Sequence, residues 1–304
     1  MGISHAQNEP QKLPAVWAWE IATEKRKIYL LGEIHRFSRL KNKTIDYQLG
    51  NEIYQFTSQI FTEFDGSAKD KNSSDALSQL LGLKTWDRLK IEITNAHNHL
   101  SMKSSEDKNN FLEKIFQEIE LSSAYSAYKV INVLAAVTSL KNMPDFYSQR
   151  GLGENLKKFE KISYEQKHSY IEDSNALAEG WAKNCSDSYR AQTLVNAALD
   201  NLAKAKTTEF DPASKVQDVF LRSATSLDDL MNALVESKEG EIIRDCVITP
   251  RNYAWLPKFK QSLETSGPSI TFLVGIGHVG GNEGLIALLQ KEGYTNIKRI
   301  YSVK

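Results

Sequence analysis

The sequence predicts an α/β fold in which a central sheet is built from N- and C-terminal strand–helix–strand segments around a large helical insertion. Three observations support this prediction. Short apolar stretches with strand character gather at both ends of the chain, each end carries a helical pattern, and the residues between show helical patterns with few strand signals. We therefore expect both ends to share one sheet, with the helical middle as a cap.

The N-terminal end begins with a predicted hairpin. Residues 16–21 alternate and include two Trp, residues 24–26 supply the turn, and residues 27–31 form a short apolar strand. Apolar residues at near-helical spacing then predict a helix over 44–60, followed by a strand over 60–64. Strand, helix and strand in this order are typical of a βαβ unit.

The C-terminal end repeats this order. The pair Thr249-Pro250 is typical of a helix start, and residues 269–274 form the clearest buried strand in the chain. A helix is expected over 282–292, closed by Gly293, with a last strand over 297–303.

The middle of the chain predicts helices rather than strands. Helical stripes occur at 111–119 and 130–140, and Ser226 is a good N-cap for a following helix. We expect residues 1–14 to be a disordered leader or tag, and residues 15–304 to form one domain in which 65–248 are the mainly helical cap.

The composition excludes several classes of partner and site. Lys and Arg number 38, as do Asp and Glu, so a net charge of zero gives no general attraction to nucleic acid. No stretch is apolar enough to cross a membrane. Two isolated cysteines, Cys185 and Cys246, do not make a thiolate metal site, and we favour buried free thiols over one disulfide.

Two Gly-x-x-His motifs stand out because each follows an apolar strand. Gly32 precedes His35, and Gly275 precedes His278 with Gly277 between them. In open α/β sheets, ligands bind beyond the carboxyl ends of the strands, so the two imidazoles could converge there as metal ligands or bases. One such motif alone more often marks a loop contact. The remaining histidines are interpreted as surface residues: His5, His97, His99 and His168.

Four other polar residues are candidates for the same site. Glu63 ends an apolar strand between aromatic neighbours, where a carboxylate needs a partner. Glu33 is two residues from His35 and could be a base, a ligand or an orienting group. Arg251 could bind a carboxylate or an oxyanion, with Asn252 beside it. Glu63, Arg251 and Asn252 could instead lie at the surface.

These segments resemble the TraB/PrgY/GumN family, which includes the Tiki proteins. The resemblance lies in residues 28–35, in Phe61-Thr62-Glu63-Phe64-Asp65, in Arg251-Asn252 with Trp255, and most specifically in 271–284. Residues 153–156 and 170–172 are only loosely similar to family landmarks. Glu33 departs from the family pattern and is closer to erythromycin esterases and haem-binding ChaN-like proteins, which share the fold.

The resemblance implies a metal-dependent hydrolase of the peptidase type. His35, His278 and Glu63 would hold a divalent ion, Mn, Co or Zn, and Glu63 or Glu33 would be the base. Arg251 would contact a substrate carboxylate or the developing oxyanion. The partner is then a peptide or small-molecule substrate rather than nucleic acid. Relatives are mostly exported, which implies a periplasmic or secreted protein, with the cytoplasm left open.

Two alternatives remain open from the sequence. A metal-independent, esterase-like hydrolase would use His35 as the base, paired with Glu33. A non-catalytic protein would use the same site to bind a peptide or haem.

Overall fold

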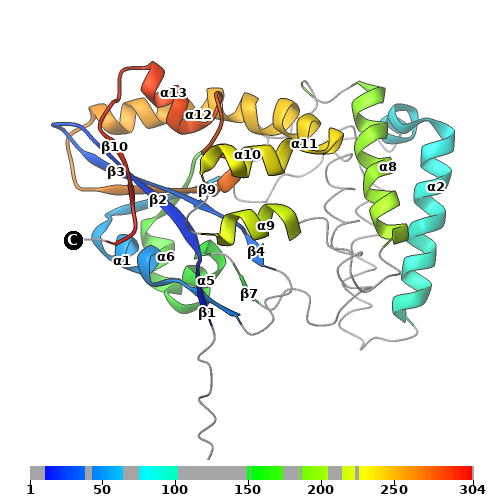
Figure 1. The fold of residues 1–304 in the computed structure, drawn as a ribbon, viewed down its shortest axis with the longest axis horizontal. Helices are drawn as coiled ribbons and strands as arrows, with labels where there is room; N and C mark the ends of the chain where they lie inside the picture. Colours follow the sequence, from blue (N-terminus) through cyan, green and yellow to red (C-terminus); the bar gives the residue numbers. More distant parts are fainter. Residues whose placement is uncertain are drawn as a thin grey trace, which may run out of the picture.

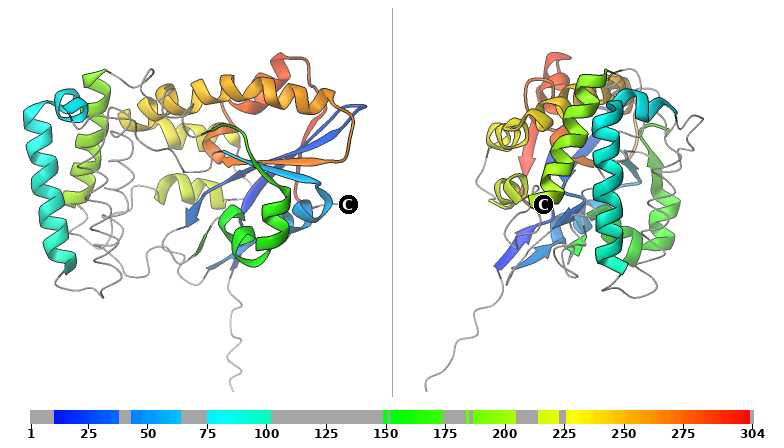
Figure 2. Two further views of the ribbon diagram at one scale, coloured as in Figure 1. Left: turned by 180° about the vertical axis from the view of Figure 1, so that it is seen from behind. Right: turned by 90° about the vertical axis from the view of Figure 1, so that its right-hand side faces the viewer.

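The computed structural model describes residues 11–37, 43–63, 75–101, 149–150, 152–173, 184, 187–204, 214–222 and 226–302. A central six-stranded sheet has the order β10-β2-β3-β9-β6-β8. Helices cover both of its faces, as expected for an α/β fold (Figures 1 and 2). The sheet strands are β2 (Val16–Ala22), β3 (Lys27–Glu33), β6 (Gln59–Thr62), β8 (His168–Tyr170), β9 (Ile270–Gly275) and β10 (Ile297–Ile300).

The two ends of the chain meet in this sheet, as the sequence predicts. β2 and β3 form the expected antiparallel hairpin, and β10 pairs with β2. β3 is parallel to β9, which is parallel to β6, so the carboxyl ends of these three strands lie at one edge. The predicted strand–helix–strand unit is present, but its two strands are not neighbours, because the C-terminal β9 lies between them.

The predicted helix over 44–60 is wrong in its first residues. Residues Lys43–Asp46 form β5, which pairs in parallel with β1 (Gln11–Pro14), and this pairing outweighs the local helical pattern. The helix α1 (Gln48–Phe56) starts after Asp46 accepts a hydrogen bond from the Gln48 amide. β1 lies in the segment expected as a leader, so residues 11–14 are part of the fold rather than of a disordered tag. A second two-stranded sheet pairs β4 (Arg36–Phe37) with β7 (Gln149–Arg150).

The helices form two layers on the sheet and a separate pair. In Figure 1, α12 and α13 lie above the sheet, α1, α5 and α6 lie below it, and α2 and α8 pack along each other at one side. Their bounds are α2 (Asp75–Ser101), α5 (Leu152–Phe159), α6 (Lys161–Lys167), α8 (Ser188–Lys204), α9 (Ser214–Leu221), α10 (Leu227–Val235), α11 (Lys238–Ile243), α12 (Thr249–Glu264) and α13 (Leu285–Lys291), with a π-helical turn η1 (Arg244–Ile248) and a 3-10 turn η2 (Ile276–His278).

The helix α12 begins at Thr249 with Pro250 in its first turn, as predicted, but Thr249 is not an N-cap, because the π-helical turn η1 runs directly into the helix. α11, η1 and α12 follow one another without a cap, and the Thr249 amide donates to the carbonyl of Arg244. Proline lacks an amide hydrogen, and the wider π turn directly before Pro250 accommodates this loss. By contrast, the Ser226 cap is confirmed, because its hydroxyl and Asp229 form a capping box. Gly293 follows α13 with a φ of +92°.

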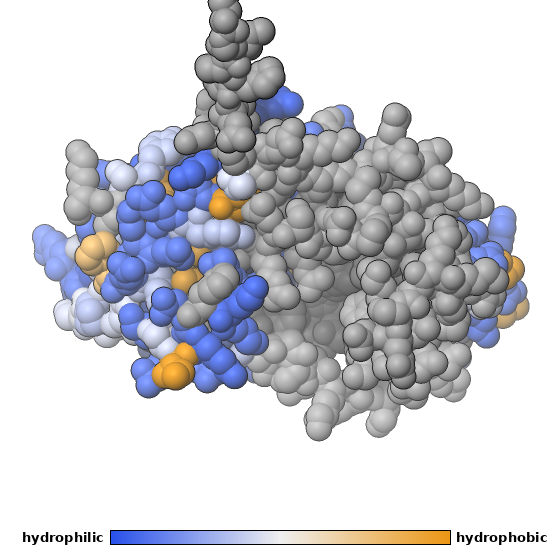
Figure 3. Space-filling view, turned by 90° about the horizontal axis from the view of Figure 1, so that it is seen from below, coloured by the Kyte–Doolittle hydropathy of each residue, from blue (hydrophilic) through white to orange (hydrophobic). Residues whose placement is uncertain are grey.

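The hydrophobic core includes residues of the sheet and of α1, α5, α9 and α12, and its aromatic stack lies between the sheet and α12. Phe272 of β9 stacks on Phe259 at 3.9 Å and on Phe61 at 4.9 Å between ring centroids. All three rings are buried, so the strand that carries Gly275 and His278 is anchored on both sides. The part of the surface that is described on the face seen from below is mostly hydrophilic, with hydrophobic side chains occurring singly (Figure 3).

Several other predictions concern undescribed residues, the cysteines, membrane spans and His168. The stripes at 111–119 and 130–140 lie outside the described residues, as do His5 and Cys185. Cys246 is a buried thiol that donates a hydrogen bond to the carbonyl of Asn184. Among the described helices, none has the length and apolarity needed to span a bilayer. His168 is half-buried in β8, where its Nε2 lies 2.6 Å from the Thr62 hydroxyl, so it is not a plain surface residue.

Candidate active site

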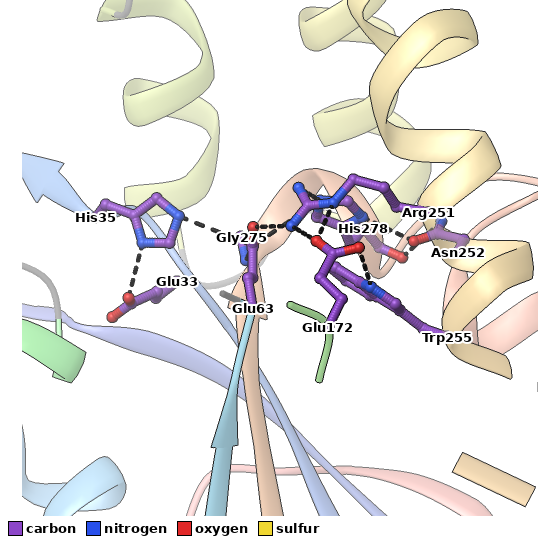
Figure 4. Close-up of polar contacts among 9 residues, drawn as sticks. All are labelled: Glu33, His35, Glu63, Glu172, Arg251, Asn252, Trp255, Gly275 and His278. Carbon is purple, nitrogen blue, oxygen red and sulfur yellow. Dashed lines mark hydrogen bonds and ion pairs between the residues drawn. The ribbon is translucent and has the colours of Figure 1, made fainter. Parts of the chain in front are cut away.

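The two histidines and Glu63 meet at the carboxyl edge of the three parallel strands. β3 ends at Glu33, two residues before His35, and Glu63 directly follows β6. His278 closes the 3-10 turn that follows β9. Because Glu33 is paired with Gly275 in the register of β3 and β9, both Gly-x-x-His turns leave the sheet at the same level. Figure 4 shows these side chains pointing toward one another.

Glu63 lies at the centre of this arrangement. Its Oε1 accepts a 2.7 Å hydrogen bond from the Gly275 amide and lies 3.9 Å from His35 Nε2 and 3.8 Å from His278 Nε2. Its Oε2 lies 2.9 Å from Arg251 Nη2. Burial raises the pKa of this carboxyl, but Arg251 and the two histidines outweigh burial and hold the pKa well below its usual range. Glu63 is therefore an anion at neutral pH.

The glycines of the two motifs provide the space for these groups. A Cβ on Gly275 would lie 3.3 Å from Glu63 Oε1, 3.6 Å from His35 Nε2 and 3.8 Å from His278 Cδ2. Gly275 thus lies between the three candidate ligands, and its missing side chain leaves space for an ion there. Gly32 and Gly277 serve packing instead, since a Cβ would meet Ile276 at 2.3 Å and Ile248 at 3.0 Å, respectively.

His278 is buried and held in one tautomer. Its Nδ1 lies 2.7 Å from Asn252 Oδ1, while the Asn252 amide nitrogen donates to the carbonyls of His278 and Glu283. Nδ1 must therefore carry the proton, which leaves the Nε2 lone pair facing the site. Burial lowers the pKa of His278 to about 3, with Arg251 and His35 acting in the same direction and Glu63 opposing them. The ring is neutral at physiological pH.

His35 lies at the open side of the site. Its side chain is 61% exposed, and its Nδ1 lies 2.9 Å from Glu33 Oε1. Partial burial lowers the pKa of His35, but the hydrogen bond to Glu33, the charge of Glu33 and then that of Glu63 raise it to about 9. Glu33 itself is buried, and its other oxygen accepts a 3.1 Å hydrogen bond from the Gly153 amide.

Arg251 is held by a glutamate that sequence reasoning did not single out. Its Nε and Nη2 lie 2.7 and 2.5 Å from Glu172 Oε1, and its guanidinium lies 4.4 Å from the centre of the Trp255 ring. The Trp255 indole donates to the other oxygen of Glu172 at 2.9 Å. Arg251 Nη1 lies 3.3 Å from His278 Nε2, which accepts from it. These contacts favour a role for Arg251 in holding Glu63 and His278 (Figure 4).

Glu172 reaches the site through the short edge strand. Beyond β8 the backbone pairing continues, since the amide of Glu172 donates to the carbonyl of Glu63. The sequence offered a weak signal, because 170–172 resembles a family landmark, but a strand of three residues has no readable alternation. The site thus unites the predicted residues with Glu172 and Trp255.

Comparison with known proteins gives one match. A search of curated proteins and a search of solved structures found none. The sequence model of the TraB/PrgY/gumN family matches residues 17–296, which include both Gly-x-x-His turns, Glu63, Glu172 and Arg251. The match covers nearly the whole chain, so the protein belongs to the TraB/PrgY/gumN family.

Proposed function

We propose that this protein is a metal-dependent hydrolase that cleaves peptides, with one divalent ion held by His35, His278 and Glu63. One observation carries the proposal: two imidazoles, each with Nδ1 held by a partner, direct Nε2 at the same carboxylate oxygen. Metal-binding histidines are typically oriented in this way, with a carboxylate or another acceptor on the second ring nitrogen.

The donor set fits a divalent ion. Two ligand atoms that share an ion at about 2.1 Å each lie roughly 3 to 4 Å apart, and the Nε2–Oε1 distances are 3.9 and 3.8 Å. Gly275 leaves the space between them open. Within the described residues, no group of three His, Cys, Asp or Glu side chains is already arranged as a metal site. Small movements of the rings and of Arg251 would therefore accompany binding.

The charges also favour a bound cation. Glu33, Glu63 and Glu172 supply three carboxylates, against the single guanidinium of Arg251. His35 can offset one more negative charge only when it is protonated, and a protonated ring cannot bind a metal. A divalent ion would balance the remaining charge.

The side chains have separate tasks in hydrolysis. A bound ion would polarise the scissile carbonyl and lower the pKa of a water molecule. His278 stays neutral, so its Nε2 remains available as a ligand over the physiological pH range. Glu63 stays anionic, and Arg251 fixes its second oxygen. Glu33 orients His35, the group most exposed to an incoming substrate.

The test compares metal content and peptide cleavage of the wild type with those of His35→Ala and His278→Ala. The control is His97→Ala on α2, a helix that packs mainly against α8. We expect both site variants to lose bound metal and cleavage of a mixed peptide library, while the control retains both. Full metal binding by the two site variants would overturn the proposal.

A metal-free hydrolase is the second candidate, supported by the Glu33–His35 pair. The 2.9 Å contact and the exposed ring are suited to a general base that meets substrate from solvent. The two candidates differ in their response to chelation, because only the metal-free hydrolase keeps its activity after exhaustive treatment with EDTA.

Two further expectations are part of the proposal. From the resemblance to exported relatives we propose that the protein works in the periplasm or outside the cell, which fractionation of the native cells would test. The cap that the sequence predicts over residues 65–248 would cover the site. Limited proteolysis with and without a peptide inhibitor would test whether these residues close over it.

A further inference from the structure

Arg251 contacts His278 Nε2, which the proposed metal ion requires, and the second oxygen of the Glu63 carboxylate. Its Nη1 lies 3.3 Å from His278 Nε2, and its Nη2 lies 2.9 Å from Glu63 Oε2. A guanidinium only donates, so this contact uses the lone pair that His278 would offer to a metal. We propose that Arg251 is an internal cation that competes with the divalent ion and sets the affinity of the site for metal. This inference rests on the proposed function.

Glu172 and Trp255 hold the guanidinium of Arg251 in place through an ion pair and a stacking contact. The contacts of Arg251 with Glu172 are 2.7 and 2.5 Å long, whereas its contact with His278 is the longest of its polar contacts described above. Stacking on Trp255, which is itself bonded to Glu172, holds the plane of the guanidinium. Entry of a metal can therefore break the His278 contact while Arg251 stays in place.

Competition follows from charge as well as from occupancy. In the metal-free site, Arg251 neutralises part of the charge of Glu63 and Glu172, and its side chain is 11% exposed. A permanent positive charge this close to a ligand atom repels an entering divalent ion, because water screens it poorly. Removing Arg251 thus frees His278 Nε2 and removes the repulsion, so both effects strengthen metal binding.

The experiment is calorimetric titration of EDTA-treated protein with MnCl2 and, separately, ZnCl2. We expect Arg251→Gln to bind at least about tenfold more tightly than the wild type. The double variant Arg251→Gln/Glu172→Gln keeps the net charge of the site and removes one of the two carboxylates that would be left unpaired. It should also bind more tightly, through the vacated His278 nitrogen. Arg88→Gln, on α2 and bonded to Asp200, is the charge-matched control.

Thermal unfolding gives a readout that does not depend on calorimetry. Without metal, Arg251→Gln should unfold at a lower temperature than the wild type, because Glu63 and Glu172 lose their counter-ion. Added Mn2+ should raise its unfolding temperature more than that of the wild type. If Arg251→Gln does not fold, the double variant decides the question.

The outcomes separate this inference from the proposed function. Equal or weaker binding by the variants than by the wild type overturns the inference and leaves the metal-dependent hydrolase intact. If only the variants bind metal, the inference is supported, because Arg251 then occupies the metal site of the wild type completely. The same result overturns the metal dependence of the wild type. Absence of binding by the wild type and by both variants overturns both.

Discussion

His35 and His278 occupy equivalent places at the ends of neighbouring parallel strands, yet their surroundings are opposite. His35 is 61% exposed and is paired with a carboxylate, which raises its pKa to about 9. The His278 side chain is 6% exposed and is paired with an amide, and burial lowers its pKa to about 3. Two copies of one motif thus supply a ring that readily gains a proton and a ring that resists one. The motif places each imidazole, and the partner of Nδ1 sets its chemistry.

Filling the space between the two histidines should have the largest effect. Gly275→Ala would place a methyl group against Glu63, His35 and His278 together. The backbone of Gly275 has a φ of −58°, which alanine adopts freely, so the fold should be retained. We expect peptide cleavage and Mn2+ affinity to fall by about a hundredfold or more. Cleavage within threefold of wild type would show that the two rings do not act on one centre.

The next largest effect is expected when the amide paired with His278 is replaced by a carboxylate like the one paired with His35. Asn252→Asp replaces the amide that donates to two backbone carbonyls by a carboxylate that cannot donate. We expect the free energy of unfolding to fall by about 2 to 4 kcal/mol, and the pKa of His278 to rise. Urea unfolding at pH 7 measures the first effect, with Asn51→Asp on α1 as control. A loss equal to that of the control would contradict the assigned hydrogen bonds.

The buried ring should also make stability depend on pH on the acid side. The unfolded chain takes up a proton at His278 near pH 6.5, whereas the folded ring stays neutral down to about pH 3. This contribution is complete above pH 6.5 and is lost as the pH falls. Between pH 6.5 and 5, before Glu63 titrates even in the unfolded chain, we expect a slope approaching about 1.4 kcal/mol per pH unit.

Chemical unfolding in EDTA at several pH values measures this slope. His278→Gln should reduce it, because the glutamine side chain does not titrate. An unchanged slope in this variant would mean that another group causes the acid sensitivity.

The exposed ring should show the smallest effect, with the opposite sign. The pKa of His35 is raised, so its contribution to stability is present below pH 6.5 and is lost as the pH rises through about 9. Because solvent screens a ring that is 61% exposed, this contribution is about 1 kcal/mol. Glu33→Gln should move the pKa of His35 toward 6.5 in an NMR titration, whereas Glu52→Gln on α1 should not. A pKa that stays near 9 in Glu33→Gln would remove Glu33 as its cause.

The elements that the sequence predicted well are those with local patterns. The alternation of the first hairpin and the apolar run before Gly275 are both readable without tertiary information. β5 was missed because its strand form depends on pairing with β1. Glu172 was missed because its contacts with Arg251 and Trp255 link residues 79 and 83 positions apart. The pKa of His278 could not be predicted from the sequence either, because it depends on burial in the folded protein, and the tautomer depends on an asparagine 26 positions away.

The position of β9 has a consequence for how the protein is made. This strand is synthesised after both of its neighbours, β3 and β6, yet it lies between them in the sheet. The earlier strands cannot close their sheet without it, and contacts between residues about 240 positions apart form slowly. Nascent chains and truncated products therefore carry His35 and Glu63 without His278. Any hydrolytic activity that needs both histidines is thereby withheld until His278 has been synthesised.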